Sequence, residues 1–462
     1  MSPRHLLKKG AKIVQIDVLV AEIGSTTTVV NAFDGIKTNN PRFLGQGQAP
    51  TSVLAGDVRI GLTGAIANLQ TKLKICQLKY REMFATSSAA GGLRMSVHGL
   101  VFDMTVRAAK EAALGAGAIV YQVTAGRLRT TDLKKLGDLA PNIILLAGGV
   151  DYGERETALA NAKQLAQLGQ KIPIIYAGNV ENQAEIALIL KDYPLYVVDN
   201  VFPRIDELNV EPARRVIQEV FEKNIIHAPG MEAVFEMVTE AIMPTPGAVM
   251  EASKLIQKQL GDVLVLDVGG ATTDVHSVTA GCEKLNQLQI SPEAMAKRTV
   301  EGDLGVYVNA ANVAKLIGAE QLAKAGFNVE SQLADYQFIP KTPQAKKFVL
   351  RLTEEAVMQA VNRHVGKIRH VYGPTGRRTL VQGKDLTQVK YLIGTGGALT
   401  QLDGAQAILE KILTTPNDDL LLPKSSAKVL LDHDYTMASL GVLASKYEEA
   451  SLLLLKKSLI KA

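Results

Sequence analysis

Apolar and polar positions follow two rhythms along the chain, and each rhythm predicts a different arrangement of strands. Residues 17–34 contain an apolar run, a Gly-Ser turn and a second apolar run, a pattern that predicts a β-hairpin. Beyond Pro141, short apolar runs at 143–147, 172–177 and 195–198 are separated by stretches with helical spacing. Strands that alternate with helices form βαβ units, so this second region predicts a parallel sheet.

The stretches of helical spacing in the second region lie at 154–168, 181–191 and 211–223. We predict that residues of about 115–225 form an α/β subdomain inserted into a first lobe. Glycines at 148–149 and 178 follow its strands, where parallel sheets place ligand-contacting turns. The same glycines are also explained if they only make tight turns, and the sequence leaves both interpretations open.

A cluster of helix breakers at 243–247 separates the two halves of the chain. It predicts a boundary between a first lobe at 1–245 and a second lobe at 246–462. Within the second lobe, the residues at 340–347 and 373–383 predict exposed loops.

The composition is that of a soluble globular protein with two or three domains. Of 462 residues, 47% are hydrophobic and 21% are charged, which excludes a disordered chain. The net charge of +5 is small and well mixed along the chain. Because no zinc-finger, RNA-platform or basic-helix pattern accompanies it, we expect no nucleic-acid partner.

The sequence also argues against export and against a membrane span. Asp17 and Glu22 interrupt the apolar run near the N-terminus, so we expect no signal peptide. No uncharged apolar stretch is long enough to cross a bilayer, and the apolar tail at 452–455 predicts a terminal helix that packs on the body. The two cysteines, Cys76 and Cys282, lack any CxxC pattern, which argues against zinc or a disulfide and favours a reducing cytoplasm.

One motif occurs twice, at 19–28 and at 264–274. Each copy is an apolar run that ends in a carboxylate, Glu22 or Asp267, followed by Gly two residues later and a hydroxyl-rich turn. A single strand followed by Gly-Ser is common, but two copies with matching carboxylate, glycine and threonines are far less expected by chance. The duplication predicts two related lobes that face each other across a nucleotide.

Phosphate binding explains the residue types of this motif. Gly lets the backbone approach a ligand closely, successive N–H groups in a tight turn attract anions, and Ser and Thr add neutral donors. A carboxylate at a strand end can hold Mg²⁺, usually through water, and Glu22 and Asp267 are placed for that role. The residues predicted to contact the phosphates are Gly24, Ser25, Thr26, Thr27, Gly269, Gly270, Thr272 and Thr273.

Two further features complete the predicted site. A glycine-rich turn behind the apolar segment 391–393 predicts packing against the adenosine, although a plain strand-to-helix turn has the same pattern. Asp274 ends the second copy of the motif and is a candidate catalytic residue that orients a water or hydroxyl nucleophile near the γ-phosphate. Alternatively, Asp274 hydrogen-bonds its own hairpin. The residues of the predicted adenosine turn are Gly394, Thr395, Gly396 and Gly397.

Small residues at 436–444 predict either close helix packing between the lobes, as a hinge requires, or an ordinary buried helix. Several common catalytic motifs are absent from the sequence. It contains no GxxxxGK[ST] P-loop, no GxSxG and no HExxH, and its histidines show no metal-like spacing.

The duplicated motif and the glycine-rich turn resemble the phosphate and adenosine segments of the actin, Hsp70 and sugar-kinase superfamily. Within that superfamily, nearly the whole chain resembles the accessory L protein of glutamate mutase, the GlmL or MutL family that is unrelated to DNA mismatch repair. The segments that carry this resemblance are 23–28, 144–149, 177–179, 208–214, 267–274, 298–305 and 394–397.

The resemblance implies an α/β fold with two ribonuclease-H-like lobes hinged around a nucleotide cleft that holds ATP and Mg²⁺. It also implies a chaperone-like, slow Mg-dependent ATPase that protects or reactivates an adenosylcobalamin-dependent mutase or aminomutase of the glutamate mutase type. Lobe closure would be coupled to opening of the mutase and release of damaged cobalamin. The resemblance also allows a homodimer.

The chain departs from known patterns at two places. The family usually has Asp where this chain has Glu22, and the extra methylene matters because Mg²⁺ demands near-octahedral geometry. Asp274-x-His276 resembles the start of the DxHxxG cobalamin-binding signature, but Thr279 stands where that signature needs glycine. We therefore expect that the chain does not carry cobalamin in that way.

Two other functions stay open on the sequence. A small-molecule kinase on the same fold would transfer phosphate rapidly to a sugar or carboxylate, but no acceptor-binding constellation is evident. A non-hydrolysing scaffold would bind nucleotide without turnover, and the substitution of Glu22 for Asp keeps that function open.

Overall fold

The computed structural model describes most of the 462-residue chain. The described residues are 13–24, 27–52, 57–88, 93–116, 118–205, 207–225, 231–240, 242–334, 336–337, 339–373, 376–415 and 419–460. Two residues of the first predicted phosphate turn, Ser25 and Thr26, lie outside these ranges.

The first lobe is built on a five-stranded sheet whose order is β3-β2-β1-β4-β10. The strands β1, β2 and β3 form an antiparallel meander, and β4 and β10 extend it in parallel to β1. The predicted hairpin over 17–34 is confirmed as β1 and β2. The elements of this lobe are β1(Ile13–Ile23), β2(Thr27–Asp34), β3(Arg42–Pro50), α1(Val58–Leu73), β4(Gln77–Ser87), α7(Met231–Met237) and β10(Met243–Pro244).

The second lobe repeats the same topology. Its sheet has the order β13-β12-β11-β16-β17, with an antiparallel meander over β11, β12 and β13 and two strands added in parallel to β11. Its strands are β11(Val263–Val268), β12(Thr273–Val278), β13(Ala296–Glu301), β16(Tyr391–Thr395) and β17(Lys428–Leu431). Two sheets with the ribonuclease-H-like strand order confirm the predicted two-lobed α/β fold.

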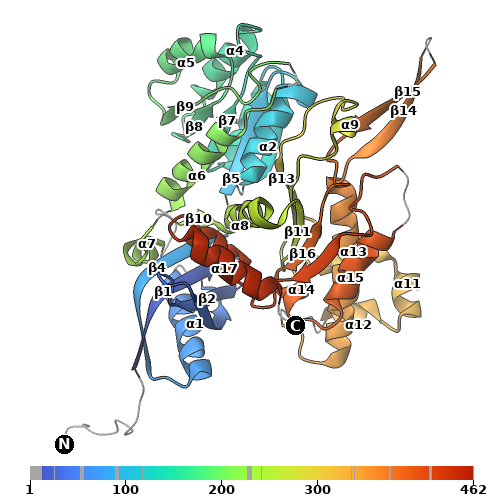
Figure 1. Cartoon of the computed structure of the whole chain (residues 1–462). Coiled ribbons are helices and arrows are strands. Elements are labelled where there is room, and N and C mark those ends of the chain that lie inside the picture. The colour runs from blue at the N-terminus through green and yellow to red at the C-terminus, as the bar shows by residue number, and fades with distance from the viewer. Residues whose placement is uncertain are drawn as a thin grey trace, which may run out of the picture.

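Two small-residue helices lie between the lobes and share one core with both sheets (Figure 1). The helix α8(Thr245–Leu260) follows the fifth strand of the first sheet, and α16(Met437–Leu443) follows the fifth strand of the second. They pack so closely that a Cβ on Gly441 would lie 1.8 Å from the carbonyl oxygen of Ala248. The small residues at 436–444 therefore serve helix contact, and α17(Glu448–Leu459) then packs on the body as predicted.

A third sheet, of five parallel strands, stands apart from both lobes at the upper left of Figure 1. Its order is β6-β5-β7-β8-β9, which confirms the parallel sheet expected beyond Pro141. We call residues 93–225, as far as they are described, the insert, because the chain leaves the first sheet after β4 and returns to it at β10. The strands are β5(Leu93–Gly99), β6(Ala118–Ala125), β7(Ile143–Leu146), β8(Ile174–Tyr176) and β9(Leu195–Val197).

The insert begins earlier than the predicted boundary near residue 115. Its first strand along the chain is β5, which lies between β6 and β7; Leu93, Met95 and Val97 are buried there but are separated by Arg94 and Ser96. This short strand lacks the continuous apolar run that identified β7, β8 and β9, because it is interrupted by polar residues. The helices of the insert are a π-helical turn η3(Phe102–Val106), α2(Arg107–Gly115), α3(Thr130–Leu139), α4(Glu156–Leu165), η4(Val180–Asn182), α5(Gln183–Ile189) and α6(Glu211–Ile225).

Two segments predicted as exposed loops are regular structure, so that prediction was wrong. The segment at 340–347 contains the start of α13(Pro343–His364), where the Thr342 hydroxyl accepts a hydrogen bond from the Ala345 N–H (3.1 Å) and Pro343 occupies the first turn. The segment at 373–383 contains β15(Gly376–Gln382), which pairs with β14(Lys367–Gly373). The remaining helices are α9(Glu283–Asn286), α10(Ala310–Ile317), α11(Ala319–Lys324), α12(Val329–Ala334), α14(Gly397–Thr400) and α15(Ala405–Thr414).

Within the described ranges, none of the helices combines the length and the apolar character that a bilayer span requires. Cys76 is exposed and Cys282 is partly buried, and the two do not form a disulfide.

Candidate nucleotide site

The two copies of the motif form matching turns at the ends of β1 and β11. In the first, the Gly24 N–H donates to the carbonyl of Thr27 (2.9 Å); in the second, the Gly269 N–H donates to the carbonyl of Thr272 (2.9 Å). A Cβ on Gly24 would lie 2.6 Å from the Thr27 carbonyl oxygen, so the first turn requires glycine there. The backbone duplication inferred from sequence is therefore present in three dimensions.

Both turns join strands in the same register. Glu22 lies opposite Val29 in the first hairpin, and Asp267 lies opposite Asp274 in the second. The two strand-end carboxylates thus occupy equivalent positions. They also interact electrostatically, because the Glu22 charge raises the pKa of Asp267.

The Glu22 carboxylate is buried and held by three hydrogen bonds. Its Oε1 accepts from the backbone N–H of Ser439 (3.1 Å), from the Ser439 hydroxyl (2.5 Å) and from the Asn31 amide (3.2 Å). Ser439 lies in α16 and so belongs to the opposite lobe. Burial raises the pKa of Glu22 to about 7, the Asp432 charge adds to that rise, and the bonds from Ser439 and Asn31 oppose it.

The Asp267 carboxylate is different. It makes no hydrogen bond and no ion pair with any residue that the structure describes, although only part of its surface meets solvent. Its pKa is raised to about 7, mainly by loss of solvation and also by the charges of Asp274, Glu22 and Asp432, whereas Arg298 acts to lower it. Asp267 is therefore a poorly compensated carboxylate among other carboxylates.

Asp432 was not among the residues singled out from the sequence. It directly follows β17 and is 1% exposed. Its carboxylate accepts hydrogen bonds from the backbone N–H groups of Thr436 (2.9 Å) and Met437 (2.8 Å) and from the hydroxyls of Thr395 (3.0 Å) and Ser458 (2.6 Å). Burial raises its pKa. The signal that identified Glu22 and Asp267, a carboxylate at the end of an apolar run, is also present here.

Three backbone N–H groups beside Asp267 are available to an anion. Gly270, Ala271 and Thr272 donate no backbone hydrogen bond to the described part of the chain. The turn is held from behind, because the Gly270 carbonyl accepts from the N–H groups of Tyr307 (2.9 Å) and Val308 (2.8 Å). Successive unpaired N–H groups in a fixed turn form an anion-binding concavity.

The hydroxyls of the second turn are less available than the sequence suggested. Thr273 is fully buried and donates to the carbonyl of Leu304 (2.8 Å), so its hydroxyl faces inward. Thr272 donates to the Asp274 carboxylate (3.0 Å). The backbone of the second turn is thus better placed for a phosphate than the Thr273 side chain.

The Gly394–Gly397 segment joins β16 to α14, as the strand-to-helix pattern predicted. Gly396 has φ of +86°, and a Cβ there would lie 2.6 Å from Asp267 Oδ1 and 2.5 Å from the Val268 carbonyl oxygen. Glycine is required at this position because the turn presses against the end of β11. Thr395 donates to Asp432, whereas nothing lies within 4 Å of a Cβ built on Gly397.

Asp274, the predicted catalytic residue, is in a buried ion pair. Its Oδ1 lies 2.9 Å from Nε and 2.5 Å from Nη2 of Arg298, a side chain that is 1% exposed. The guanidinium also donates to the carbonyls of Leu114 (3.0 Å) and Ala118 (3.1 Å) in the insert. This pair connects the turn at Thr272 to the insert, and the catalytic role of Asp274 stays a prediction.

Further cations attach the insert to the second lobe. Arg107 donates to the Pro292 carbonyl (2.6 Å) and lies 3.4 Å from the Glu293 carboxylate. Lys297 is paired with Glu293 (2.8 Å) and with Glu111 of the insert (3.4 Å). The insert is therefore joined to the first lobe by the chain and to the second lobe by charge.

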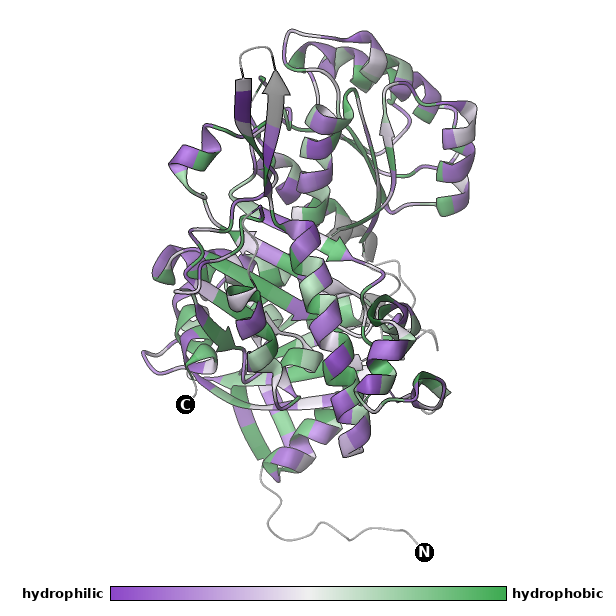
Figure 2. Cartoon of the chain, turned by 90° about the vertical axis from the view of Figure 1, so that its right-hand side faces the viewer, coloured by the Kyte–Doolittle hydropathy of each residue, from purple (hydrophilic) through white to green (hydrophobic). Residues whose placement is uncertain are grey.

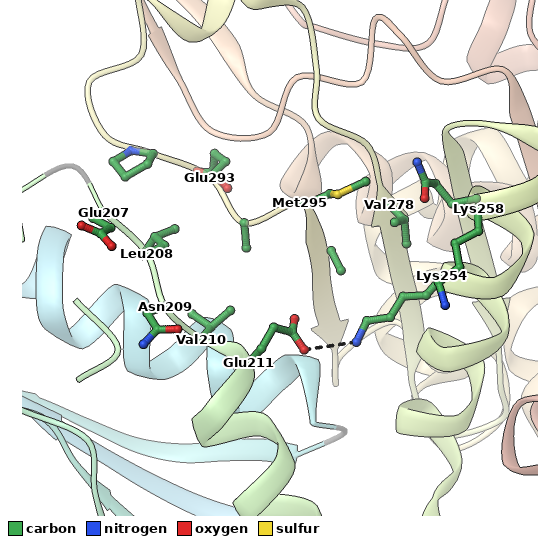
Figure 3. A pocket seen from close by; sticks show the side chains of 14 residues that line it. Glu207, Leu208, Asn209, Val210, Glu211, Lys254, Lys258, Val278, Glu293 and Met295 are labelled. Atoms are coloured by element: carbon green, nitrogen blue, oxygen red, sulfur yellow. Dashed lines mark hydrogen bonds and ion pairs between the residues drawn. The ribbon is translucent and has the colours of Figure 1, made fainter. Parts of the chain in front are cut away.

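A cavity of about 710 Å³ lies where the insert, α8 and β13 meet (Figure 3). Lys254 of α8 reaches across it to Glu211 of α6, with 3.3 Å between Nζ and Oε2. The cavity touches Val278 and Ala296, the ends of β12 and β13 that lie farthest from the turn at Thr272. It is thus separate from the carboxylate cluster, and no motif in the sequence pointed to it.

The glycine turns of the insert have a packing explanation. A Cβ on Gly178 would lie 2.5 Å from the backbone nitrogen of Gly148, so the two turns touch each other. Asn179 is fully buried, and its side chain accepts from the N–H groups of Tyr152 (3.1 Å) and Glu181 (3.0 Å). These contacts favour tight turns over a ligand site.

The two carboxylates predicted to hold Mg²⁺, Glu22 and Asp267, fit that ion in part. Mg²⁺ prefers oxygen ligands and usually keeps several waters while it binds one or two carboxylates and substrate phosphates. Among the described residues, both oxygens of Asp267 are without partners, whereas one oxygen of Glu22 is fixed by hydrogen bonds. The described residues contain no group of three or more His, Cys, Asp or Glu side chains arranged to hold a metal ion by themselves.

Comparisons with known proteins cover nearly the whole chain. The family model described as MutL protein matches residues 18–459. Protein MutL of Clostridium tetanomorphum is 35% identical over 461 residues, which is 96% of this chain and 99% of that protein.

Two solved structures are similar over most of the chain at low identity. A diol dehydratase-reactivating factor in nucleotide-free form matches 94% of this chain and 100% of its own, with 11% identity and a TM-score of 0.39. A nucleotide-free acetone carboxylase matches 93% of this chain and 70% of its own, with 12% identity and a TM-score of 0.38.

Proposed function

The chain belongs to the MutL protein family, and from that premise we propose that it is an ATP-dependent accessory factor for an adenosylcobalamin-dependent enzyme. The partner that we propose is a mutase or aminomutase of the glutamate mutase type, and the action is reactivation through release of damaged cobalamin. The observation that carries the nucleotide part is the Asp267 carboxylate beside three backbone N–H groups, none of which has a hydrogen-bond partner in the part of the chain that the structure describes. Such a pair of features suits a cation bound to a phosphate.

In this proposal, the second lobe supplies most of the phosphate and metal contacts. The N–H groups of Gly270, Ala271 and Thr272 would bind phosphate oxygens, and Asp267 would hold Mg²⁺. Glu22 shares the metal site from the first lobe, and Gly396 allows the adenosine turn to approach. The metal, when bound, neutralises charge on the phosphates, and the residues of the chain fix where those phosphates lie.

The insert would transmit the nucleotide state to the partner. Thr272 donates to Asp274, Asp274 is paired with Arg298, and Arg298 holds two carbonyls of the insert. A shift of the turn on phosphate binding would therefore reach the insert through two side chains. Because the insert is joined to the first lobe by the chain, any change in the angle between the lobes strains these contacts.

We also propose where the chain divides into lobes, where it lies in the cell and which oligomeric state it can adopt. The first lobe comprises 1–245 with the insert inside it, and the second lobe comprises 246–462. We propose a cytoplasmic location because the two cysteines show no disulfide pattern, and we allow a homodimer on the family resemblance.

One observation favours a second function, a nucleotide-binding switch without hydrolysis. Glu22 Oε1 is fixed by Ser439 and Asn31, and Asp274 is fixed by Arg298. Both candidate bases are therefore engaged in the state described. Hydrolysis in the proposed reactivator requires that partner binding or lobe closure free one of them.

The test is ATP hydrolysis with Mg²⁺, measured with and without the adenosylcobalamin-dependent mutase of the same cells. We expect slow basal turnover that the mutase stimulates, loss of turnover in Asp267→Ala, and normal turnover in Asp138→Ala, which removes an exposed carboxylate. ATP binding without turnover would favour the switch. Phosphate transfer to a small sugar or carboxylate would favour a kinase, and absence of nucleotide binding would contradict the site itself.

A further inference from the structure

A two-stranded ribbon projects from the second lobe, at the upper right of Figure 1 and the upper left of Figure 2. It consists of β14 and β15, which form a sheet of their own. The body holds only its base, where the Ile368 N–H donates to the Asp419 carbonyl (2.8 Å) and the Val381 N–H donates to the Leu288 carbonyl (2.8 Å). Val381 is fully buried there, whereas Arg369 and Arg378, farther out, are exposed.

The ribbon is strongly basic. No Asp or Glu occurs between Glu355 and Asp385. Its cations are Lys367, Arg369, Arg377 and Arg378, all of them exposed.

Within the described ranges, none of these four side chains has a carboxylate partner. Arg377 contacts only the ring of His370, with 2.7 Å between Nη2 and Nε2. By contrast, Arg363 at the end of the neighbouring helix is paired with both Glu301 and Asp303. The ribbon thus gathers four cations without a carboxylate partner among the described residues on two paired strands.

The closely spaced cations destabilise the ribbon when nothing is bound to it. Arg369 pairs with Leu380, and Arg378 pairs with Val371, so the two arginines are diagonal neighbours on one face of the ribbon. Like charges at such positions repel each other, and an isolated two-stranded ribbon is only marginally stable in water. A ribbon that projects under these conditions is best explained if an anionic surface covers it in the working complex.

We propose that β14 and β15 form a docking arm for an acidic surface on the enzyme that the chain serves; the identity of that enzyme rests on the function proposed above. A protein suits the arm better than a nucleic acid does. Four cations make few phosphate contacts, and the net charge of +5 over the whole chain provides no wider basic surface. The outer edges of the ribbon also offer unpaired backbone groups, which a protein strand can extend.

The arm is separate from the nucleotide chemistry. Its base contacts the residues 288–290 and 419–421, and its strands point away from the second lobe (Figure 1). None of its cations contacts Glu22, Asp267, Asp274 or Asp432 among the described residues. Charge reversal in the arm should therefore leave ATP binding and basal turnover unchanged.

The experiment compares full-length wild type, Arg369→Glu/Arg378→Glu and a matched control, Arg204→Glu/Lys324→Glu. The control makes the same change in net charge at side chains that are 84% and 74% exposed and lie outside the arm. Association with the adenosylcobalamin-dependent mutase is measured by surface plasmon resonance at several salt concentrations. Basal ATP binding, and binding of duplex DNA and RNA of 30 base pairs (about three helical turns), are measured in parallel.

We expect the arm variant to weaken association by about 10-fold or more, mostly through a slower on-rate, and to reduce its salt dependence. The control should change association by less than about 3-fold, since isolated rim charges contribute little. Equal association of the arm variant and the wild type would overturn the arm while leaving the proposed function intact. A wild type that binds ATP but no mutase would contradict the proposed partner and the arm together. Tight nucleic-acid binding that the arm variant loses would also overturn the proposal.

Discussion

At the end of β1, Glu22 is held by three hydrogen bonds, two of which come from the opposite lobe; at the end of β11, Asp267 has no partner among the described residues. The described backbone at the two strand ends matches, since Gly24 and Gly269 each make a closing bond of 2.9 Å and the two hairpins have the same register. Two equivalent positions have thus been given different tasks. Glu22 joins the lobes, and Asp267 faces the space between them.

Side-chain length accounts for part of this difference. A carboxylate one methylene longer than Asp extends farther from β1, and here it meets the first turn of α16 at Ser439. The longer side chain of Glu22 thus makes a contact between the lobes. In the proposed function, the metal role therefore falls mainly to Asp267.

The second hairpin has a charge that the first lacks. Asp274 occupies the register position of Val29 in the first hairpin, and only Asp274 is tied to an arginine. Since Arg298 then reaches the carbonyls of Leu114 and Ala118, the added charge links the second turn to the insert. From this asymmetry we infer that the first copy, at Glu22, holds the lobes together and that the second copy, at Asp267, senses phosphate.

The largest expected effect comes from breaking the link at Arg298. Arg298→Met leaves Asp274 as a buried, unpaired charge and deprives two carbonyls of a donor, so we expect a loss of about 3–5 kcal/mol in the free energy of unfolding. The measurement is chemical denaturation.

The double variant Arg298→Met/Asp274→Val places valine in the second hairpin at the register position that Val29 occupies in the first. It should recover a large part of that stability, because no buried charge remains, but it should lose stimulation by the partner. Full stimulation in a folded double variant would contradict the proposed link.

The next largest effect concerns the two strand-end carboxylates. Asp267→Asn should lower ATP turnover by about 10²–10³-fold, because a charge that positions the metal is removed. Glu22→Gln keeps an oxygen that accepts from Ser439, so its loss of turnover should be at least 10-fold smaller. Equal losses in the two variants, measured by phosphate release, would contradict the division of tasks.

A smaller effect is expected at the contact between the lobes. Ser439→Ala removes a hydroxyl that donates to the buried Glu22 carboxylate and accepts from the Asn31 amide (2.8 Å), and it should lower the free energy of unfolding by about 1.5–3 kcal/mol. Ser445→Ala, in which the lost hydroxyl donates to the Val442 carbonyl near the end of the same helix, is the matched control. If both variants lose the same stability, Glu22 is not the reason why Ser439 matters.

The smallest effect is a pH dependence. The pKa of Glu22 is raised from 4.5 to about 7, so its contribution to stability is complete below about pH 4.5 and is lost as the pH rises through 7. Glu22→Gln does not titrate, so its stability relative to wild type should improve between pH 5 and pH 8 by on the order of 2 kcal/mol. Thermal unfolding of both proteins across this range checks the sign, and a relative decline with rising pH would contradict it.

The sequence predicted most of the site and missed the residues that only tertiary structure brings to it. Glu22, Asp267 and the Gly396 turn were found because each lies in a local pattern of apolar run, carboxylate and glycine. Asp432 was missed although it also follows an apolar run, because nothing local shows that β17 ends beside β16. Arg298 was missed because a buried arginine is recognised only when its distant partners are known.

The fold shows the same division between local and distant information. Strands with continuous apolar runs, such as β7 and β8, were predicted, whereas β5 alternates with polar residues and was not. The ribbon at 367–382 was predicted in part as a loop because glycines and cations dominate its outer half. Its strands are visible only once their pairing is known.

The most direct test of the account is calorimetric titration of ATP into wild type, Asp267→Asn and Glu22→Gln, each with Mg²⁺ and with a chelator. We predict that Mg²⁺ strengthens ATP binding in wild type and in Glu22→Gln, and that this gain is lost in Asp267→Asn while ATP still binds. An Mg²⁺-dependent gain that persists in Asp267→Asn, or that disappears only in Glu22→Gln, would contradict the assignment of the metal to the second lobe.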